Sequence, residues 1–311
     1  MNSIVYGPVQ SRRLGRSLGI NIIPAKTCTL DCVYCQCGRT TCKTLARRSF
    51  YPPELIVERV RQALKGQRVD CLTFSGEGEP TLNRDIGRLI RRLKREFRIP
   101  VVVITNSTLL TRPQVRQDLL AADIVVPSLD AVDQRTFMKV NRGHPRLKIE
   151  RIIAGLKRFR RKYKGRFWLE IMLVKGVNDA VEHVVRLRQV AWELRPDKVH
   201  LNTVVRPPAE PFALPMDEED MQNIRLLFGG DAEICGVPAG RIRAGRGRAA
   251  VRDVAERVLA SLAGRPSTIE DLAVGLNLPR TLVANTLRWL VRSGRCRETR
   301  FGHRRYFTHC R

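Results

Sequence analysis

The chain has 311 residues, of which 43% are hydrophobic, and this is enough to build one large and one small domain with buried cores. Its 57 Lys and Arg residues against 30 Asp and Glu give a formal net charge of +27. This charge indicates a polyanionic partner, such as a nucleic acid. The alternative interpretation is that the arginines cover solvated helix faces and bind no partner. No run of 18 apolar residues occurs, and residues 1–10 lack a basic-then-apolar leader. We therefore expect no transmembrane helix, no secretory signal and no membrane partner.

Six short apolar runs alternate with amphipathic helical patterns along the first 205 residues. The runs are residues 18–23, 71–75, 101–105, 124–128, 167–174 and 199–205, and the helical patterns are residues 53–64, 85–97, 112–121, 148–163 and 180–194. Continuous apolar strands separated by helices predict a parallel sheet in an α/β fold. Right-handed crossovers can wind six such units into a partial (β/α)6, TIM-like barrel, whose chemistry lies at the C-terminal ends of the strands.

A change in composition divides the chain near residue 236. Residues 236–249 are rich in Gly, Pro and Arg, which predicts a linker between a barrel of residues 1–235 and a small domain of residues 250–311. Three helical patterns and a hairpin that turns at residues 301–303 are typical of a winged helix-turn-helix. On the last helix we expect Trp289 and Leu290 to pack inward, and the residues expected to face outward are Arg280, Asn285, Arg288 and Arg292.

Nine cysteines are present, and five of them crowd between Cys28 and Cys42. An odd and clustered set argues for a metal site in a reducing cytoplasm and against a secreted disulfide framework. Cys28, Cys32 and Cys35 follow the first predicted strand with the spacing C-x3-C-x2-C. Three thiolates can bind three irons of a [4Fe–4S] cluster and leave the fourth iron open for a small molecule. A zinc site of four thiolates, completed by Cys37 or Cys42, is the structural alternative.

Polar residues follow each of the first four predicted strands, at the barrel end where chemistry is expected. They are Tyr34 within the cysteine motif, Gly78 and Glu79 in FSGEGEPTL, Asn106 in ITNSTLL, and Ser128 and Asp130 in VPSLDA. With the cysteine triad, this set resembles the motifs of the radical S-adenosylmethionine (radical SAM) superfamily, whose members are Fe–S enzymes.

The resemblance implies two cofactors and the residues that bind them. A [4Fe–4S] cluster sits on the triad, and S-adenosylmethionine (SAM) on the open iron is cleaved reductively to a 5′-deoxyadenosyl radical, with ferredoxin or flavodoxin as the type of electron donor. The implied SAM contacts are Tyr34 beside the adenine, Gly78 and Glu79 at the amino group, Asn106, Ser128 and Asp130 at the ribose or carboxylate, and Arg142 at the carboxylate. Lys175, at the end of the fifth strand, is the candidate catalytic acid, base or substrate anchor.

Longer segments between residues 7 and 211 resemble one branch of the superfamily, the tRNA wyosine-base (4-demethylwyosine synthase-like) Fe–S oxidoreductases. They are GPVQSRRLGRSLGINIIPAKTCTLDCVYC, SLDAVDQRTFMKVNRGHP, MLVKGVND and LNTVVRPPAEP. Enzymes of that branch carry a second cluster on cysteines before the triad, and this chain has no cysteine before Cys28. We therefore expect a different reaction. Cys37 and Cys42 are a candidate second metal site, with bystander thiols as the alternative.

The charge, the branch and the basic C-terminal domain favour RNA, and tRNA first, as the substrate. Two alternatives stay open: a maturase that modifies a peptide or metallocofactor precursor, and an Fe–S DNA-binding regulator that senses SAM or redox state. Arg12, Arg13 and Arg16, beside the first strand, are candidates for binding a phosphate or carboxylate.

Overall fold

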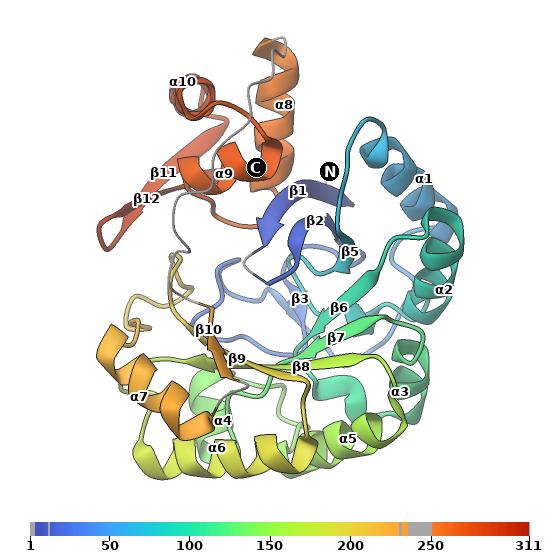
Figure 1. Ribbon diagram of the computed structural model, residues 1–311, viewed down its shortest axis with the longest axis vertical. Coiled ribbons are helices and arrows are strands. Elements are labelled where there is room, and N and C mark those ends of the chain that lie inside the picture. The colour runs from blue at the N-terminus through green and yellow to red at the C-terminus, as the bar shows by residue number, and fades with distance from the viewer. Residues whose placement is uncertain (1–3, 12, 230–231, 236–250, 311) are drawn as a thin grey trace.

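The computed structural model describes residues 4–11, 13–229, 232–235 and 251–310, so the predicted linker lies outside the described residues. Its larger part is one eight-stranded sheet with helices on its outer side, curved into an open barrel (Figure 1). The six predicted strands are parallel neighbours in chain order, and they are β2 (Gly15–Ile20), β5 (Cys71–Phe74), β6 (Val101–Thr105), β7 (Ile124–Pro127), β8 (Arg166–Leu173) and β9 (Lys198–Thr203). The predicted partial barrel is therefore confirmed.

The two edge strands of the sheet add to the predicted six. β1 (Val5–Ser11) pairs antiparallel with β2, and β10 (Ala232–Ile234) pairs parallel with β9. Within the described residues β1 and β10 do not pair with each other, so the barrel is open along one side.

Five helices cover the outer side of the sheet at the predicted positions: α1 (Pro53–Leu64), α2 (Ile86–Phe97), α3 (Pro113–Leu119), α5 (Ile149–Lys162) and α6 (Val181–Leu194). The remaining elements of this part are the short strands β3 (Thr27–Cys28) and β4 (Cys42–Lys43), the 3-10 turns η1 (Pro80–Leu82) and η2 (Thr108–Thr111), and the helices α4 (Gln134–Val140) and α7 (Glu218–Phe228). No helix in the described part of the chain is both long and apolar enough to cross a bilayer.

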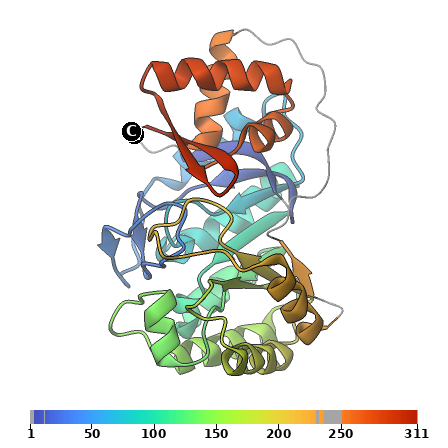
Figure 2. The same cartoon turned by 90° about the vertical axis from the view of Figure 1, so that its left-hand side faces the viewer.

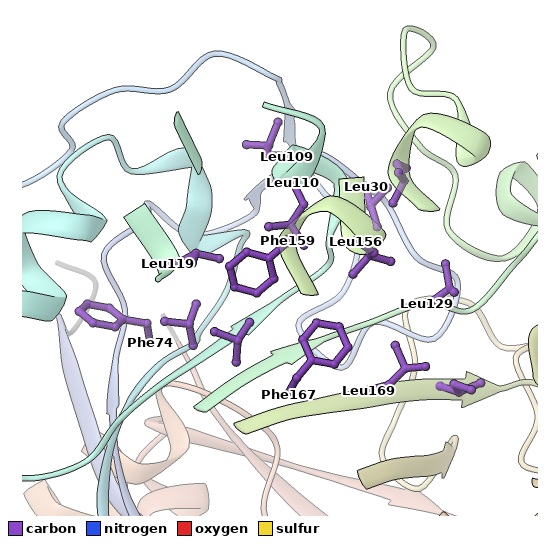
Figure 3. Close-up of a cluster of buried hydrophobic side chains, with 14 of the residues drawn as sticks. Leu30, Phe74, Leu109, Leu110, Leu119, Leu129, Leu156, Phe159, Phe167 and Leu169 are labelled. Atoms are coloured by element: carbon purple, nitrogen blue, oxygen red, sulfur yellow. The ribbon is translucent and has the colours of Figure 1, made fainter. Parts of the chain in front are cut away.

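The main core lies between the sheet and the outer helices (Figure 3). Phe159 of α5 is fully buried and stacks on Tyr163, with 4.8 Å between ring centroids. Phe167 of β8 lies 6.3 Å from the Phe159 ring, in the range where aromatic rings attract one another. This packing makes the sheet a rigid frame, and the loops at its C-terminal edge are held by that frame.

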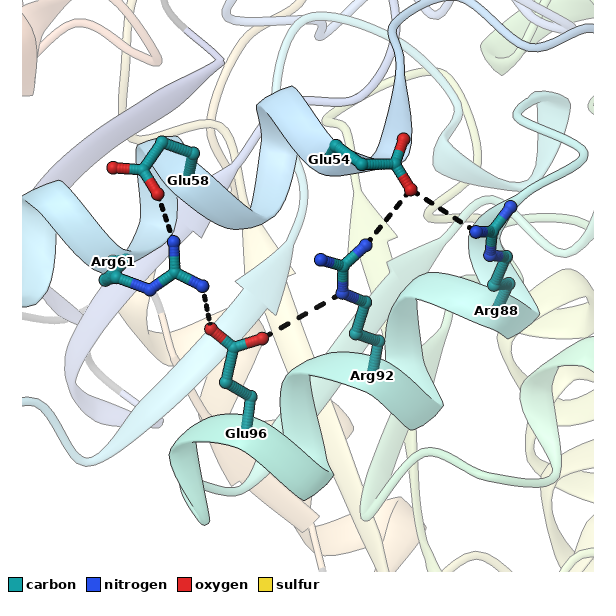
Figure 4. A network of polar contacts seen from close by, with 6 residues as sticks. All are labelled: Glu54, Glu58, Arg61, Arg88, Arg92 and Glu96. Atoms are coloured by element: carbon teal, nitrogen blue, oxygen red, sulfur yellow. Dashed lines mark hydrogen bonds and ion pairs between the residues drawn. The ribbon is translucent and has the colours of Figure 1, made fainter.

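The dense basic run of α2 faces water and is partly neutralised by α1. Six side chains form a surface network between the two helices (Figure 4): Glu54, Glu58, Arg61, Arg88, Arg92 and Glu96. Arg92 lies 3.2 Å from Glu54 and 3.9 Å from Glu96. Exposed pairs of this kind contribute only about 0–1 kcal/mol each, so the network is a solvated face and not a folding determinant.

The C-terminal part is a smaller unit with its own apolar core. It consists of α8 (Val251–Leu262), α9 (Ile269–Leu276), α10 (Arg280–Arg292) and the antiparallel pair β11 (Cys296–Phe301) and β12 (Arg304–His309) (Figure 2). Thr268 caps α9: its side chain accepts from the Asp271 backbone N–H at 3.1 Å, and Asp271 accepts from the Thr268 N–H at 3.2 Å. This reciprocal capping starts the helix at the position that Ser267 and Thr268 predict.

The C-terminal unit is joined tightly to β1, beside the open side of the barrel (Figure 1). The Tyr6 ring lies between two glycines, because a methyl group at Gly19 or Gly264 would stand 2.1 Å or 2.6 Å from ring atoms. Arg265 donates to the Gln10 carbonyl at 3.1 Å. On the other side of the opening, the Tyr306 hydroxyl donates to the carbonyl of Val205, which follows β9. The unit therefore contacts both sides of the opening.

Candidate active site

A cavity of about 360 Å³ opens at the C-terminal ends of the barrel strands. Its wall includes the cysteine triad, Glu79 after β5, Asn106 after β6 and Ser128 after β7, together with residues from β8 and β9. These groups come from segments far apart in the sequence, and the parallel sheet brings them together because its parallel strands end at the same edge. The cavity has the size of a site for a small molecule, and its lining combines apolar side chains with a few polar and charged groups, as is usual for such sites.

Cys28 ends β3, and Cys32 and Cys35 lie in the loop between β3 and β4. The thiols of this triad are half-buried and unpaired. Two amides hold them: the Asn106 side chain donates to Cys28 Sγ at 3.5 Å, and the Asn141 side chain donates to Cys32 Sγ at 3.4 Å. The Cys35 backbone N–H closes a turn on the Cys32 carbonyl at 3.1 Å. Weak donors aimed at sulfur stabilise thiolates, which suits an Fe–S cluster.

The protein surroundings alone do not keep all three thiols ionised. Burial, with the nearby Glu79 carboxylate, raises the pKa of Cys28 to about 12. Burial, with Asp130, raises the pKa of Cys32 well above its ordinary value. The pKa of Cys35 is lowered because its side chain takes a hydrogen bond from Cys37. A bound cation would supply the missing positive charge, since metal ligation replaces the thiol protons.

Glu79 is the most heavily hydrogen-bonded carboxylate of the site. It is 3% exposed and caps η1. Its Oε1 accepts from the Thr81 N–H at 3.0 Å, the Thr81 hydroxyl at 2.6 Å and the Thr105 hydroxyl at 2.7 Å. Its Oε2 accepts from the Asn106 N–H at 2.7 Å. Burial raises the pKa of Glu79, while these bonds oppose the shift. The carboxylate is therefore fixed in one orientation at the cavity wall.

Gly78 allows the Glu79 loop to lie against the triad loop. A methyl group at Gly78 would stand 2.0 Å from the Thr27 carbonyl, a distance that no side chain can occupy. The two loops are joined there by the Glu79 N–H, which donates to the Thr27 carbonyl at 3.3 Å, and by the Lys26 N–H, which donates to the Glu77 carbonyl at 2.9 Å. Only glycine permits this close approach of two backbones.

Of the residues predicted to bind SAM, Asp130 is placed differently from its neighbours. Tyr34, Asn106 and Ser128 line the cavity, whereas Asp130 borders a smaller pocket beside it. Asp130 is 3% exposed and accepts from the Tyr34 hydroxyl, the Asn141 side chain at 2.7 Å and the Met172 N–H at 2.9 Å. Burial raises the pKa of Asp130. In this arrangement the carboxylate positions the Tyr34 ring at the cavity wall.

Two predicted residues lie outside the cavity lining. The Arg142 guanidinium stands 2.6 Å from Glu210 and 3.8 Å from Asp31. Lys175 pairs with Asp217 at the surface, and this pairing raises its pKa. Neither cation therefore lines the cavity, although Arg142 lies beside the triad loop through Asp31.

The cysteines after the triad also separate. Cys37 lines the cavity next to Cys35, while Cys42 is exposed on β4 and is not part of the lining. Among the described residues, no group of three or more His, Cys, Asp or Glu side chains is already arranged to hold a metal ion. The side chains of the cysteine triad are likewise not yet in such an arrangement. The second metal site near Cys37 and Cys42 stays a prediction.

Of three further charged residues in the lining, only Arg13 is predicted from the sequence as a binding residue. Arg13 lies in the cavity and pairs there with Glu170 of β8, and Arg206 follows β9. Glu170 interrupts the apolar strand WLEIML, and this single inward charge was the available signal. Arg12 lies outside the described residues. Arg16 is tied to Gln67 at 3.4 Å and is not part of the lining.

Comparisons with known proteins identify the family of the chain. The family model described as "Radical SAM superfamily" matches residues 22–188. A UPF0026 protein from Methanocaldococcus jannaschii is 42% identical over 229 residues, which is 73% of this chain and 71% of that relative. A protein named GTPase Obg from Brachyspira hyodysenteriae is 35% identical over 94% of this chain, but the chain spans only 43% of that relative.

Among solved structures, a radical SAM methyltransferase from Sphaerobacter thermophilus has a similar fold. The TM-score is 0.55 at 20% identity, over 70% of this chain and 65% of that structure. The agreement covers the barrel fold, and the family match contains the triad, Glu79 and Asn106. The chain therefore belongs to the radical SAM superfamily and, within it, groups with the UPF0026 proteins.

Proposed function

We propose that Cys28, Cys32 and Cys35 hold the [4Fe–4S] cluster of this radical SAM enzyme and that SAM binds beside them in the cavity, with Glu79 at its amino group. The observation that carries the proposal is that one cavity contains all three thiols and the fixed Glu79 carboxylate. The donor set fits the group, because the three thiols of the C-x3-C-x2-C motif can bind three irons and leave the fourth iron available to SAM. Cys37, which also lines the cavity, lies outside this motif.

The residues around the cavity have separable tasks. When bound, the cluster and SAM supply a radical that abstracts hydrogen from a substrate. Glu79 Oε2 accepts one protein hydrogen bond, from Asn106, and has a further lone pair for an ammonium group. Tyr34, held by Asp130, presents its ring to the same cavity and is suited to pack against the adenine. The barrel wall and the C-terminal unit limit the access of water.

We propose RNA, and tRNA first, as the substrate. The net charge of +27 and the resemblance of residues 7–35 to tRNA-modifying enzymes support it.

The order of three helices and a hairpin supports the assignment of residues 250–311 as a winged helix-turn-helix. Its α10 exposes Arg288, Trp289 and Arg292 on one surface. Trp289 is 52% exposed, which corrects the expectation that it packs inward, and an exposed aromatic among arginines is typical of surfaces that stack bases.

The proposal predicts SAM cleavage that responds to RNA. We expect the anaerobically reconstituted full chain to release 5′-deoxyadenosine, and bulk tRNA to increase this release. The tRNA effect should disappear after RNase treatment. Cleavage that is indifferent to tRNA would overturn the RNA substrate in favour of a peptide or metallocofactor precursor. An intact cluster without any SAM cleavage would overturn the site assignment.

The α10 surface predicts a second result. Replacing Trp289 by Ala is expected to weaken tRNA binding about 5- to 100-fold, because stacking contributes about 1–3 kcal/mol per base. Replacing Arg288 by Gln should lower the slope of log affinity against log salt by about 1. Filter binding at several salt concentrations measures both. Arg95→Gln on exposed α2 is the matched control and should change neither quantity. Unchanged affinity in Trp289→Ala would exclude α10 as the RNA contact.

A further inference from the structure

The wall of the cavity also carries two arginines that come from different parts of the chain. Arg206 follows β9, and Arg265 lies between α8 and α9 of the C-terminal unit. Both line the cavity that also contains the cysteine triad. The C-terminal unit thus contributes a charged side chain to the same cavity as the triad.

The backbone holds both guanidiniums in place. Arg206 Nε donates to the Pro266 carbonyl at 3.0 Å, and Arg265 donates to the Gln10 carbonyl at 3.1 Å. The Arg206 side chain is 13% exposed, and the Asp271 carboxylate lies 3.7 Å from it. Burial and the like charge of Arg265 lower the pKa of Arg206 to about 10. Two cations therefore lie close enough in the cavity wall to repel each other, with the Asp271 carboxylate beside Arg206.

The other charged residues of the lining have partners of their own. Arg13 and Glu170 form an ion pair with each other. Glu79 accepts hydrogen bonds from its four donors in the loops beside the triad. Buried like charges cost free energy, and an anion between them removes that cost. Guanidinium groups match carboxylate and phosphate oxygens with paired N–H donors, so two of them in one cavity wall supply the charge and the type of donor that an oxyanion needs.

We infer that Arg206 and Arg265 form the subsite that binds an oxyanion of the substrate, a carboxylate or a phosphate. This inference rests on the proposed function, because it takes the cavity as the place of SAM chemistry. It gives the C-terminal unit a direct part in substrate binding: Arg265 reaches the substrate only while this unit covers the open side of the barrel.

Calorimetric titration of the full, cluster-loaded chain with pyrophosphate, and separately with succinate, tests the subsite. The titrations are made in 150 mM salt, where exposed charges are largely screened. We expect saturable binding of at least one anion, weakened 10-fold or more in Arg265→Gln and Arg206→Gln and partly restored in Arg265→Lys. Arg257→Gln is the matched control, because Arg257 also belongs to the C-terminal unit and donates to a carbonyl, that of Leu276, away from the cavity. Tighter pyrophosphate binding identifies a phosphate, and tighter succinate binding a carboxylate.

Two outcomes would overturn the subsite: no saturable anion binding by the wild-type chain, or equal binding by Arg265→Gln. A weaker SAM affinity in Arg265→Gln would assign the arginines to SAM instead, and would also overturn it. SAM cleavage without substrate, measured in parallel, reports on the proposed function separately. If the wild type binds the anion through Arg265 but never cleaves SAM, the subsite stands and the proposed function fails.

Discussion

Replacement of any one of Cys28, Cys32 and Cys35 by Ala is expected to abolish SAM cleavage and to reduce iron content to background. Each thiol would hold a different iron, and two protein ligands do not retain a cubane cluster in the cavity. The amides of Asn106 and Asn141, which donate to two of the sulfurs, offer no thiolate, and Cys37, the thiol next to Cys35, lies outside the motif that we assign to the cluster. Iron and sulfide analysis together with 5′-deoxyadenosine release measure the effect.

Cys42→Ala is the control for this series. Its side chain is exposed on β4 and does not line the cavity, so iron content and cleavage should match the wild type. Any single triad variant that keeps both its iron and its SAM cleavage would refute the assignment. Loss of iron in Cys42→Ala would instead support the predicted second metal site.

Replacement of Glu79 by Gln is expected to weaken SAM binding about 10- to 100-fold while iron content stays unchanged. Hydrogen bonds to charged groups contribute about 1.5–3 kcal/mol, and each 1.4 kcal/mol corresponds to a factor of ten in affinity. The three donors on Oε1 fix the carbonyl oxygen of the glutamine there, so its NH₂ group would face the Asn106 N–H in place of Oε2. The variant therefore presents an amide N–H donor to the amino group of SAM, where the wild type presents a negatively charged carboxylate oxygen. Equilibrium dialysis with labelled SAM measures the loss.

Glu54→Gln is the comparison for the Glu79 variant, because Glu54 is an exposed carboxylate on α1 that pairs only with surface arginines. It should bind SAM as the wild type does. Wild-type SAM affinity in Glu79→Gln would show that the carboxylate serves the fold of the loop and not the cofactor. A parallel loss of iron would show that the change disturbs the triad loop as well.

The barrel was predictable because its strands are continuous apolar runs and its helices keep a helical period. β1 was missed because Gly7 and Pro8 interrupt its pattern, and its pairing with β2 shifts register between Tyr6 and Val9. β10 has three residues, too few for a periodic signal. On α10 the buried stripe is Val283, Thr286, Leu287 and Leu290, which leaves Trp289 on the outer face. Sequence reasoning placed this tryptophan by its residue type and not by its helical position.

The site was predictable wherever one short motif carries it. The triad, Glu79 and Asn106 each follow a strand, and parallel strands bring their ends together. Arg206 and Arg265 are nearly sixty residues apart and meet only because the C-terminal unit packs back on the barrel. No local pattern marks such a pair. Arg142 and Lys175 form ion pairs with Glu210 and Asp217, acids that come from other segments of the chain, and neither cation lines the cavity.

The position of the C-terminal unit also fixes the order in which the molecule can be completed. Gln10 and Arg265, joined by a hydrogen bond, are separated by 255 positions, so β1 is covered by helices that are synthesised long after it. Until then β1 has an uncovered face, and closing a contact over such a distance is slow because the chain entropy must be lost before the packing is gained. The docking of α8 and α9 is therefore a late folding event. The wall that carries Arg265 forms only when α8 and α9 have been synthesised and have packed on β1, so a nascent barrel without them has no complete cavity in which to start a radical reaction.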